Sequence, residues 1–116
     1  MAQISEFFKF QNASTAIGQG ATLSVSNRNS MVVDIFGTNV ATRTINFYKL
    51  NMNNPPDLVE INGFNISSNI LATSTTGTGS ETWQFDDISG FNQIIMKIDT
   101  MTGTGANTTV IGTVML

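Results

Sequence analysis

The stretch ETWQFDDISGF, residues 81–91, holds the residue types in this sequence that are best suited to binding chemistry. Trp83 is the only tryptophan, and Asp86 and Asp87 follow it within four positions. An exposed indole ring could stack on a sugar, and neighbouring carboxylates could supply oxygen ligands to a calcium ion. The competing interpretation is structural, with Trp83 in the core of a strand and both acids in the turn after it.

Alternation of apolar and polar residues favours the structural interpretation. Residues two positions apart on a strand share a face, so Trp83 and Phe85 point the same way, whereas Asp86 and Asp87 point to opposite sides. Adjacent acids of this kind do not form the carboxylate pair of a glycosidase, and calcium needs several more oxygens. We predict that Trp83 and Phe85 face the core, while a cation at Asp86 and Asp87 stays open as an alternative.

The residues DISG, 87–90, have the composition of a turn. Asp87 or Ser89 can accept hydrogen bonds from backbone N–H groups that a turn leaves without partners. Gly90 can adopt a positive φ at little cost. We therefore predict structural roles for Asp87, Ser89 and Gly90, and a similar role for Gly37, which precedes another strand.

No set of residues in the sequence has the composition of a catalytic centre. The chain contains no Cys and no His, which excludes disulfides, thiolate nucleophiles, imidazole bases and the usual zinc sites. The glycine-rich pieces IGQG and TGTGSE lack the lysine and the following helix of a phosphate-binding loop. We predict that the protein is not an enzyme and that it has no cofactor site and no metal site.

Charge and hydropathy limit the partners of the protein. The formal net charge is −3, and charged residues make up 11% of the chain, compared with about a quarter in typical proteins. Clustered cations would be needed to bind nucleic acid or an anionic membrane surface, and the five basic residues are scattered. The N-terminal residues do not resemble a signal peptide, so we expect synthesis without Sec export unless a signal has been removed. The basic residues are Lys9, Arg28, Arg43, Lys49 and Lys97.

The elements that would position these residues are strands. Apolar residues alternate with polar ones, and turn residues separate the alternating segments. This pattern predicts an all-β fold, a single antiparallel β-sandwich of jelly-roll or Ig-like type with about seven to nine short strands. The tail NTTVIGTVML is apolar on both faces, which predicts a central strand or a strand covered by a partner. The clearest alternating segments are residues 21–26, 31–35, 43–50, 83–85, 94–98 and 110–116.

The N-terminal segment, residues 1–18, is predicted to be an arm or a first strand, followed by the sandwich at residues 19–116. Phe7, Phe8 and Phe10 make this segment too apolar for a free tail. It either completes the sandwich or docks on a neighbouring subunit by β-augmentation, and we prefer docking. Phe7, Phe8 and Phe10 are therefore the predicted partner contacts.

Two stretches resemble a β-sandwich that recurs in the virions of tailed bacteriophages. They are VVDIFGTNVATRTINFYKL and ETWQFDDISGFNQIIMKIDTMTGTGANTTVIGTVML, and the resemblance spans about residues 19–116. In that family a strand ending in Gly leads into R-x-I-x-F, W/Y-x-F-D-x-S-G-[FY] precedes a strand rich in Ile and Val, and V-x-G-x-V/A closes the chain. The loop NMNNPPDL departs from the hairpin that relatives often carry there. The matching positions are Gly37, Arg43, Ile45, Phe47, Phe85, Asp87, Ser89, Gly90, Phe91, Ile94 and Gly112.

The resemblance implies a structural virion protein, made in the bacterial host cytoplasm, most directly a capsid decoration protein that binds the outer head surface. Its expected partners are the major capsid protein and further copies of itself, with a homotrimer favoured. One alternative is a glycan- or receptor-binding sandwich of a tail or adhesin protein, which would use Trp83. A further alternative is a secreted surface subunit whose N-terminal segment acts as a donor strand.

Overall fold

The computed structural model describes residues 5–25, 29–51, 57–75, 77–88 and 90–115. Throughout these ranges the regular structure is β-sheet, and no helix is present. Accordingly, the described chain has no helix of the length and hydrophobicity that crossing a bilayer requires. The segment NMNNPPDL lies mostly outside the described residues, and its Asp57 begins a strand.

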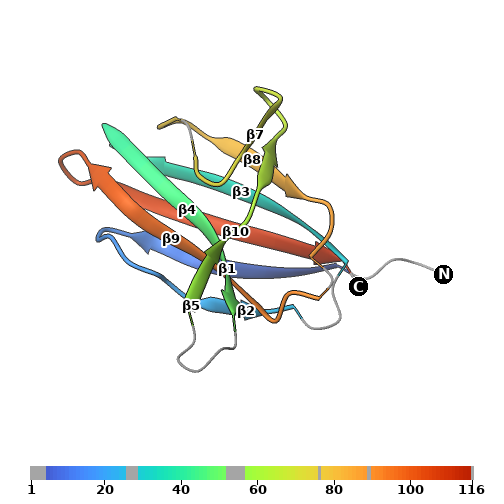
Figure 1. Ribbon diagram of the computed structural model, residues 1–116. Helices are drawn as coiled ribbons and strands as arrows, with labels where there is room; N and C mark the ends of the chain where they lie inside the picture. Colours follow the sequence, from blue (N-terminus) through green and yellow to red (C-terminus); the bar gives the residue numbers. More distant parts are fainter. Residues whose placement is uncertain (1–4, 26–28, 52–56, 76, 89, 116) are drawn as a thin grey trace.

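The strands form two antiparallel sheets that face each other (Figure 1). One sheet has six strands in the order β1-β10-β3-β8-β6-β7, and the other has four in the order β2-β9-β4-β5. The predicted antiparallel β-sandwich is thus confirmed. It has more strands than the seven to nine predicted, because three of them are only three residues long and show no alternation in the sequence. The strands are β1 (Ser5–Ser14), β2 (Thr22–Ser24), β3 (Ser30–Thr38), β4 (Thr42–Asn51), β5 (Asp57–Glu60), β6 (Gly63–Asn65), β7 (Ile70–Ala72), β8 (Glu81–Phe85), β9 (Gln93–Thr102) and β10 (Asn107–Met115).

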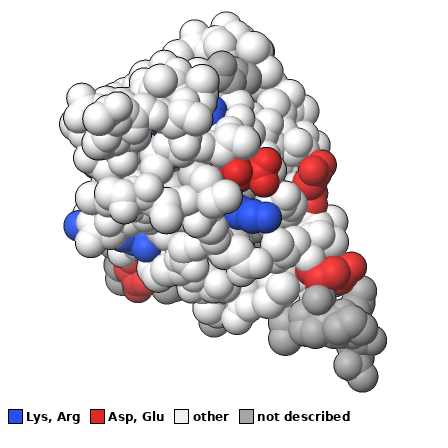
Figure 2. Space-filling model, turned by 90° about the vertical axis from the view of Figure 1, so that its left-hand side faces the viewer, with Lys and Arg blue, Asp and Glu red and all other residues white. Residues whose placement is uncertain are grey.

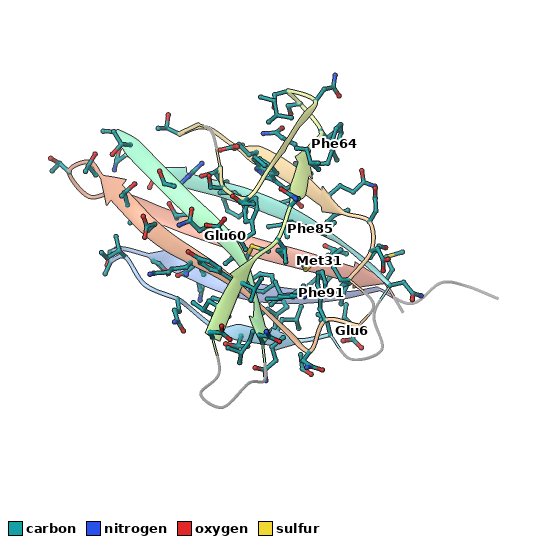
Figure 3. The ribbon with its side chains drawn as sticks, viewed as in Figure 1. Glu6, Met31, Glu60, Phe64, Phe85 and Phe91 are labelled. Carbon is teal, nitrogen blue, oxygen red and sulfur yellow. The ribbon has the colours of Figure 1, made fainter. Side chains whose placement is uncertain are left out.

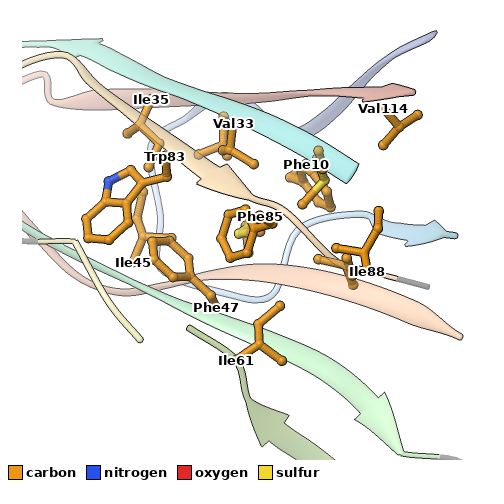
Figure 4. Packing of buried hydrophobic residues seen from close by; sticks show 14 of the residues in the cluster. Phe10, Val33, Ile35, Ile45, Phe47, Ile61, Trp83, Phe85, Ile88 and Val114 are labelled. Atoms are coloured by element: carbon orange, nitrogen blue, oxygen red, sulfur yellow. The ribbon is translucent and has the colours of Figure 1, made fainter. Parts of the chain in front are cut away.

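The core lies between the two sheets and is formed mainly by inward-facing residues of the strands (Figure 4). Phe47 on β4 packs edge-on against Trp83 and Phe85 on β8, with ring centroids 4.9 and 5.3 Å apart. Such aromatic pairs contribute about 0.5–1.5 kcal/mol beyond the burial of their area. The side chains of the core with at most 1% exposure include Phe10, Val25, Met31, Val33, Ile35, Ile45, Phe47, Trp83, Ile88, Ile94, Met96, Ile98, Val110 and Val114.

The C-terminal strand β10 occupies an interior position, between β1 and β3. Val110 and Val114 are buried in the core, while Ile111 and Met115 on the opposite face are half-buried. The tail is apolar on both faces because it is a central strand, as one of the two sequence-based alternatives predicts. Gly112 lies on the core face, where a Cβ atom would come within 2.7 Å of the Phe10 ring.

The N-terminal segment completes the larger sheet of its own chain. β1 pairs with β10 from Ser5, opposite Met115, to Ser14, opposite Thr108, with two irregularities near Gln11. After β1 the chain passes to the other sheet, where Gly18 exchanges two backbone hydrogen bonds of 2.9 Å with Ile98. Residues 5–14 are therefore a structural edge strand of this sandwich.

The segment VEINGFNIS, residues 59–67, changes from one sheet to the other. β5 pairs with β4, whereas β6 pairs with β7 and β8, so the segment is not one interrupted strand or a hairpin. The chain then returns to β4, where Phe47 N donates to Thr73 O at 2.9 Å and Thr75 N donates to Ile45 O at 3.0 Å. The edge of β4 beyond β5 is covered in this way.

Candidate interaction sites

Trp83 is a core residue. Its side chain is 0% exposed, and its indole Nε1 donates a 3.1 Å hydrogen bond to Glu81 Oε1. The sequence-based prediction that Trp83 and Phe85 face the core is confirmed, since Phe85 is 3% exposed. A buried ring has no free face for a sugar, so Trp83 cannot be the platform of a glycan site.

The residues after β8 form a turn that is anchored by Ile88. Phe91 N donates to Ile88 O at 3.1 Å, and Gly90 has a positive φ of 83°, which glycine adopts at little cost. Ile88 is 0% exposed and its amide donates to Asn29 O, so it fixes the turn to the core. Ile88 cannot be recognised as a core residue from the sequence, because it falls outside the alternation of both neighbouring strands. Ser89 lies outside the described residues.

The two acids of this turn, Asp86 and Asp87, are solvent-exposed. In the described ranges no group of three or more acidic residues is placed to hold a metal ion. A capping role for Asp87 stays a prediction. Two backbone hydrogen bonds, to the carbonyl oxygens of Ile88 and Asn29, help to fix the turn.

Gly37 lies within β3, opposite Thr108 of β10, and not in a turn. A Cβ atom at this position would overlap the carbonyl oxygen of Asn107. The structural role of Gly37 therefore comes from the close approach of two strands rather than from the turn geometry that the sequence suggests.

The three N-terminal phenylalanines have three different environments. Phe7 is 76% exposed, Phe8 is half-buried against the core, and Phe10 is 1% exposed. Phe8 and Phe10 meet edge to face with ring centroids 5.0 Å apart. Phe10 is thus a core residue of this chain rather than a partner contact, and Phe7 is the one of the three whose ring is free to meet another molecule.

Phe7 begins a row of uncharged residues that crosses the outer face of the six-stranded sheet, here called the outer row. One residue of each strand takes part, because the pairing registers place them opposite one another. Leu71, at the far end, is 66% exposed and is paired with Phe64 of β6, which Figure 3 labels. The outer row consists of Phe7, Thr113, Val32, Gln84, Phe64 and Leu71.

The outer face of the four-stranded sheet has a different composition. Its central row begins at Thr22 and runs through Ile95 and Tyr48 to Glu60. Ile95 is 3% exposed, so this row presents mainly hydroxyl and carboxylate groups to solvent. Charged side chains are few on the molecule, and uncharged residues cover most of the face shown in Figure 2.

A buried ion pair joins the two sheets. Arg43 on β4 is 4% exposed and Glu81 on β8 is 9% exposed, and Arg43 Nη2 lies 3.7 Å from Glu81 Oε2. Glu81 Oε1 also accepts from Trp83 Nε1 at 3.1 Å and from Asn65 Nδ2 at 3.2 Å. The sequence did contain a signal for this pair, since Arg43 is in phase with the buried Ile45 and Phe47.

Burial is unfavourable for the charge of Arg43. Removal from water lowers the pKa of Arg43, and the negative charge of Glu81 acts in the opposite direction. A guanidinium group still stays protonated in proteins, so Arg43 and Glu81 form a charged pair in low-dielectric surroundings. Nε and Nη1 of Arg43 are buried and have no hydrogen-bond partner among the described residues. The pair therefore contributes more to the relative position of the two sheets than to the free energy of unfolding.

The arrangement suits contact with another surface better than chemistry on a small substrate. The part of the surface formed by described residues has no pocket. What it offers is the outer row, which is uncharged and partly apolar, on a sheet face that carries Lys9 and Asp34 in the next row.

Two solved structures are similar to this fold over its whole length. The SPBc2 prophage-derived protein YomS has a TM-score of 0.87 and 27% identity, with 100% of this chain and 96% of that chain covered. The PBSX exported protein XepA has the same TM-score and 28% identity, but this chain spans only 39% of it. No curated protein matches the chain in sequence.

These similarities support a phage-related origin, which is the broader part of the resemblance seen in the sequence. YomS corresponds to the sandwich as a separate protein, whereas XepA carries further chain beyond it. The family model named XepA matches residues 5–114, from the start of β1 to near the end of β10. Since this match takes in both sheets, the chain belongs to the XepA family.

Proposed function

We propose that the protein is a non-catalytic structural protein of phage origin that works by binding other protein subunits through the outer row. The observation that carries this proposal is the exposure of Phe7 and Leu71, 76% and 66%, at the two ends of an uncharged row. Exposed apolar groups aligned across a sheet are typical of protein contact surfaces. The prophage origin of YomS supports a role connected with a phage.

The finer form of this proposal is a capsid decoration protein that binds the outer surface of the head. It rests on the resemblance of residues 32–50 and 81–116 to virion sandwiches, and a 116-residue domain with few charges is compatible with it. The partners would be the major capsid protein and further copies of the chain, with a trimer favoured by the resemblance. The location would then be the virion.

Particles produced with and without the gene test the proposal. If the protein decorates the head, purified particles contain it, and particles without it disrupt at a lower temperature. Added purified protein then binds to the deficient particles and restores their heat resistance. Particles that lack the protein in both preparations and do not bind it when it is added would rule out a decoration role.

The outer row is tested by a double substitution, Phe7→Ser with Leu71→Ser. This variant should fold, since both side chains project into solvent, and it should no longer bind to deficient particles. Thr22→Ala is the matched control, because Thr22 is exposed on the outer face of the other sheet. Equal binding by the two variants would exclude the outer row as the contact surface.

A second candidate function is supported by the relative XepA, which is described as an exported protein. In this form the protein would act after leaving the cytoplasm rather than as part of the particle. Fractionation of induced cells separates the two functions, since a decoration protein sediments with particles and an exported protein collects outside the cell apart from them. A glycan-binding role is not proposed, because Trp83 is buried.

A further inference from the structure

The segment immediately before β8 is attached to the sandwich by polar contacts. Residues 77–80 read GTGS, and none of them is an apolar residue that could anchor the segment in the core. Gly77 N donates to Glu81 Oε2 at 3.2 Å, and Gly79 O accepts from Arg43 Nη2 at 2.5 Å. Both contacts are made to the buried ion pair, one to each partner.

The two glycines of this segment are not required by space or by backbone conformation. A Cβ atom on Gly79 would have nothing within 4 Å, and one on Gly77 would meet Glu81 Oε2 at an ordinary 3.7 Å. Neither residue has a positive φ. Elsewhere the fold uses glycine differently, since a Cβ atom on Gly112 would come within 2.7 Å of the Phe10 ring. What glycine adds at positions 77 and 79 is backbone freedom.

In the ion pair beneath this segment, some hydrogen-bond donors of Arg43 are not paired among the described residues. Arg43 is 4% exposed, yet its Nε and Nη1 are buried without hydrogen-bond partners in the part of the chain that the structure describes. Unpaired buried donors favour states in which water reaches them. The hydrogen bonds that close the segment therefore compete with the hydration that opening would provide.

We propose that residues 77–80 form a strap that opens before the rest of the sandwich and, when open, uncovers Arg43 and Glu81. The ladder on either side is independent of the strap, because Thr75 stays bonded to Ile45 of β4 and Trp83 stays paired with Val33 of β3. Opening thus breaks the contacts of Gly77 and Gly79 and leaves both sheets intact.

Opening also changes the chemistry of this end of the molecule. The neighbouring turns, residues 38–42 and 103–107, contain no charged residue, and neither does the strap. Ala41 N donates to Thr102 O at 2.8 Å, which places the two turns side by side next to Arg43. The closed strap presents an uncharged surface, and the open strap presents a guanidinium beside a carboxylate. The strap is a device that switches this end between the two.

Amide hydrogen exchange of the full chain tests the strap directly. The Gly77 amide reports strap opening, and the amides of the central strand β10 report global unfolding. We expect a protection factor for Gly77 at least about tenfold below those of β10, with little dependence on low urea concentrations, as local opening exposes little surface. A Gly77 amide with the protection and the urea dependence of β10 would overturn the proposal.

Two variants sharpen the test. Gly79→Ala should lower the population of the open strap, and so raise the protection of Gly77, by about two- to fivefold, because alanine has less backbone freedom than glycine in the open segment. The same restriction acts in the globally unfolded chain, so the protection of β10 should rise by a similar factor. Glu81→Gln alters the acceptor of the Gly77 amide and removes the counter-charge of Arg43, so it should lower the protection of both Gly77 and β10. Asp99→Asn is the control, since Asp99 is an exposed acid 3.9 Å from Lys97. Unchanged Gly77 protection in Gly79→Ala would show that residue 79 is not freed when the Gly77 amide exchanges, and would overturn the proposal.

Discussion

The inner and outer faces of the six-stranded sheet arise from the same alternation and have opposite environments. On β1, Phe10 is 1% exposed and Phe7 is 76% exposed. On β8, Trp83 is 0% exposed, while its neighbour Gln84 is exposed. Because neighbouring residues on a strand point to opposite faces, each strand supplies the core and the outer row at once. Substitutions on the inner face should change stability, and those on the outer face should change binding.

The two faces also differ in how their residues are held. Inner side chains are held by edge-on contacts between aromatic rings, by the Arg43–Glu81 ion pair and by the close approach of backbone segments. Large outer side chains such as Phe7 and Leu71 project into solvent instead. Residue size alone therefore does not predict the effect of a substitution on this sheet.

The largest effect is expected for Trp83→Ala on the inner face. Trp83 fills the space beside Phe47, and truncation of a buried tryptophan costs about 3–5 kcal/mol of unfolding free energy. It also leaves Glu81 Oε1 without one of its donors. Urea unfolding followed by circular dichroism measures the change, because the only tryptophan is lost in the variant.

Gln84→Ala is the matched control for Trp83→Ala, one residue along the same strand. Gln84 belongs to the outer row, so its truncation should change the free energy of unfolding by no more than about 0.5 kcal/mol. Equal losses for both variants would contradict the division between the two faces.

The next effect is expected for Glu81→Leu, which removes the acid of the buried pair. Arg43 would be left as a buried charge without a counter-charge, which costs about 3–5 kcal/mol in comparable sites. The hydrogen bonds from Asn65 and Trp83 would also lose their acceptor. The same urea titration should therefore show a marked drop in the midpoint.

A double-mutant cycle separates the charge from the other contacts of Glu81. Glu81→Gln keeps an oxygen acceptor for Trp83 and Asn65, and Arg43→Met keeps the length of the side chain without its charge. The double variant should be more stable than the sum of the two single losses predicts, because neither charge is left alone. Simple additivity would mean that the 3.7 Å ion pair has no energetic role.

A smaller effect is expected for Gly112→Ala on the inner face of β10. The added methyl group would lie 2.7 Å from Phe10 Cε2 and 3.3 Å from Met31 Sδ, so the ring must move. Overpacking of this kind costs about 1–3 kcal/mol, which thermal unfolding can measure. Gly79→Ala provides the comparison, since nothing lies within 4 Å of its Cβ position. A Gly112→Ala variant as stable as Gly79→Ala would show that the core is looser than these distances indicate.

The sequence predicted most of the inner face and little of the outer one. Alternation is a local property, so Trp83, Phe85 and the central position of β10 could be recognised without knowing the pairing of strands. The outer row is a property of register across six strands, and register is not visible in one strand. Phe7 and Leu71 lie far apart in the sequence, and nothing local marks them as ends of one row.

The buried pair of Arg43 and Glu81 could not be predicted from the sequence for a different reason. Arg43 and Glu81 are in phase with core residues. Charged residues are usually exposed, however, and in the sequence Arg43 is one of five scattered basic residues. Only the packing of β4 on β8 brings the two charges together. The change of sheet after β5 also depends on tertiary packing. Ile61 and Gly63 are both buried in the same core, so the sequence pattern does not show that the chain crosses from one sheet to the other between them.

The smallest effect on stability and the clearest effect on binding are expected for Phe7→Ser. The ring is 76% exposed, so its removal should change the free energy of unfolding by no more than about 0.5 kcal/mol. If the outer row is a contact surface, the same change should weaken self-association, measured by light scattering, and binding to deficient particles. Phe10→Ser should do the reverse on the neighbouring face, with a large loss of stability. A Phe7→Ser variant that unfolds easily and still binds would invert the comparison and make β1 a purely structural strand.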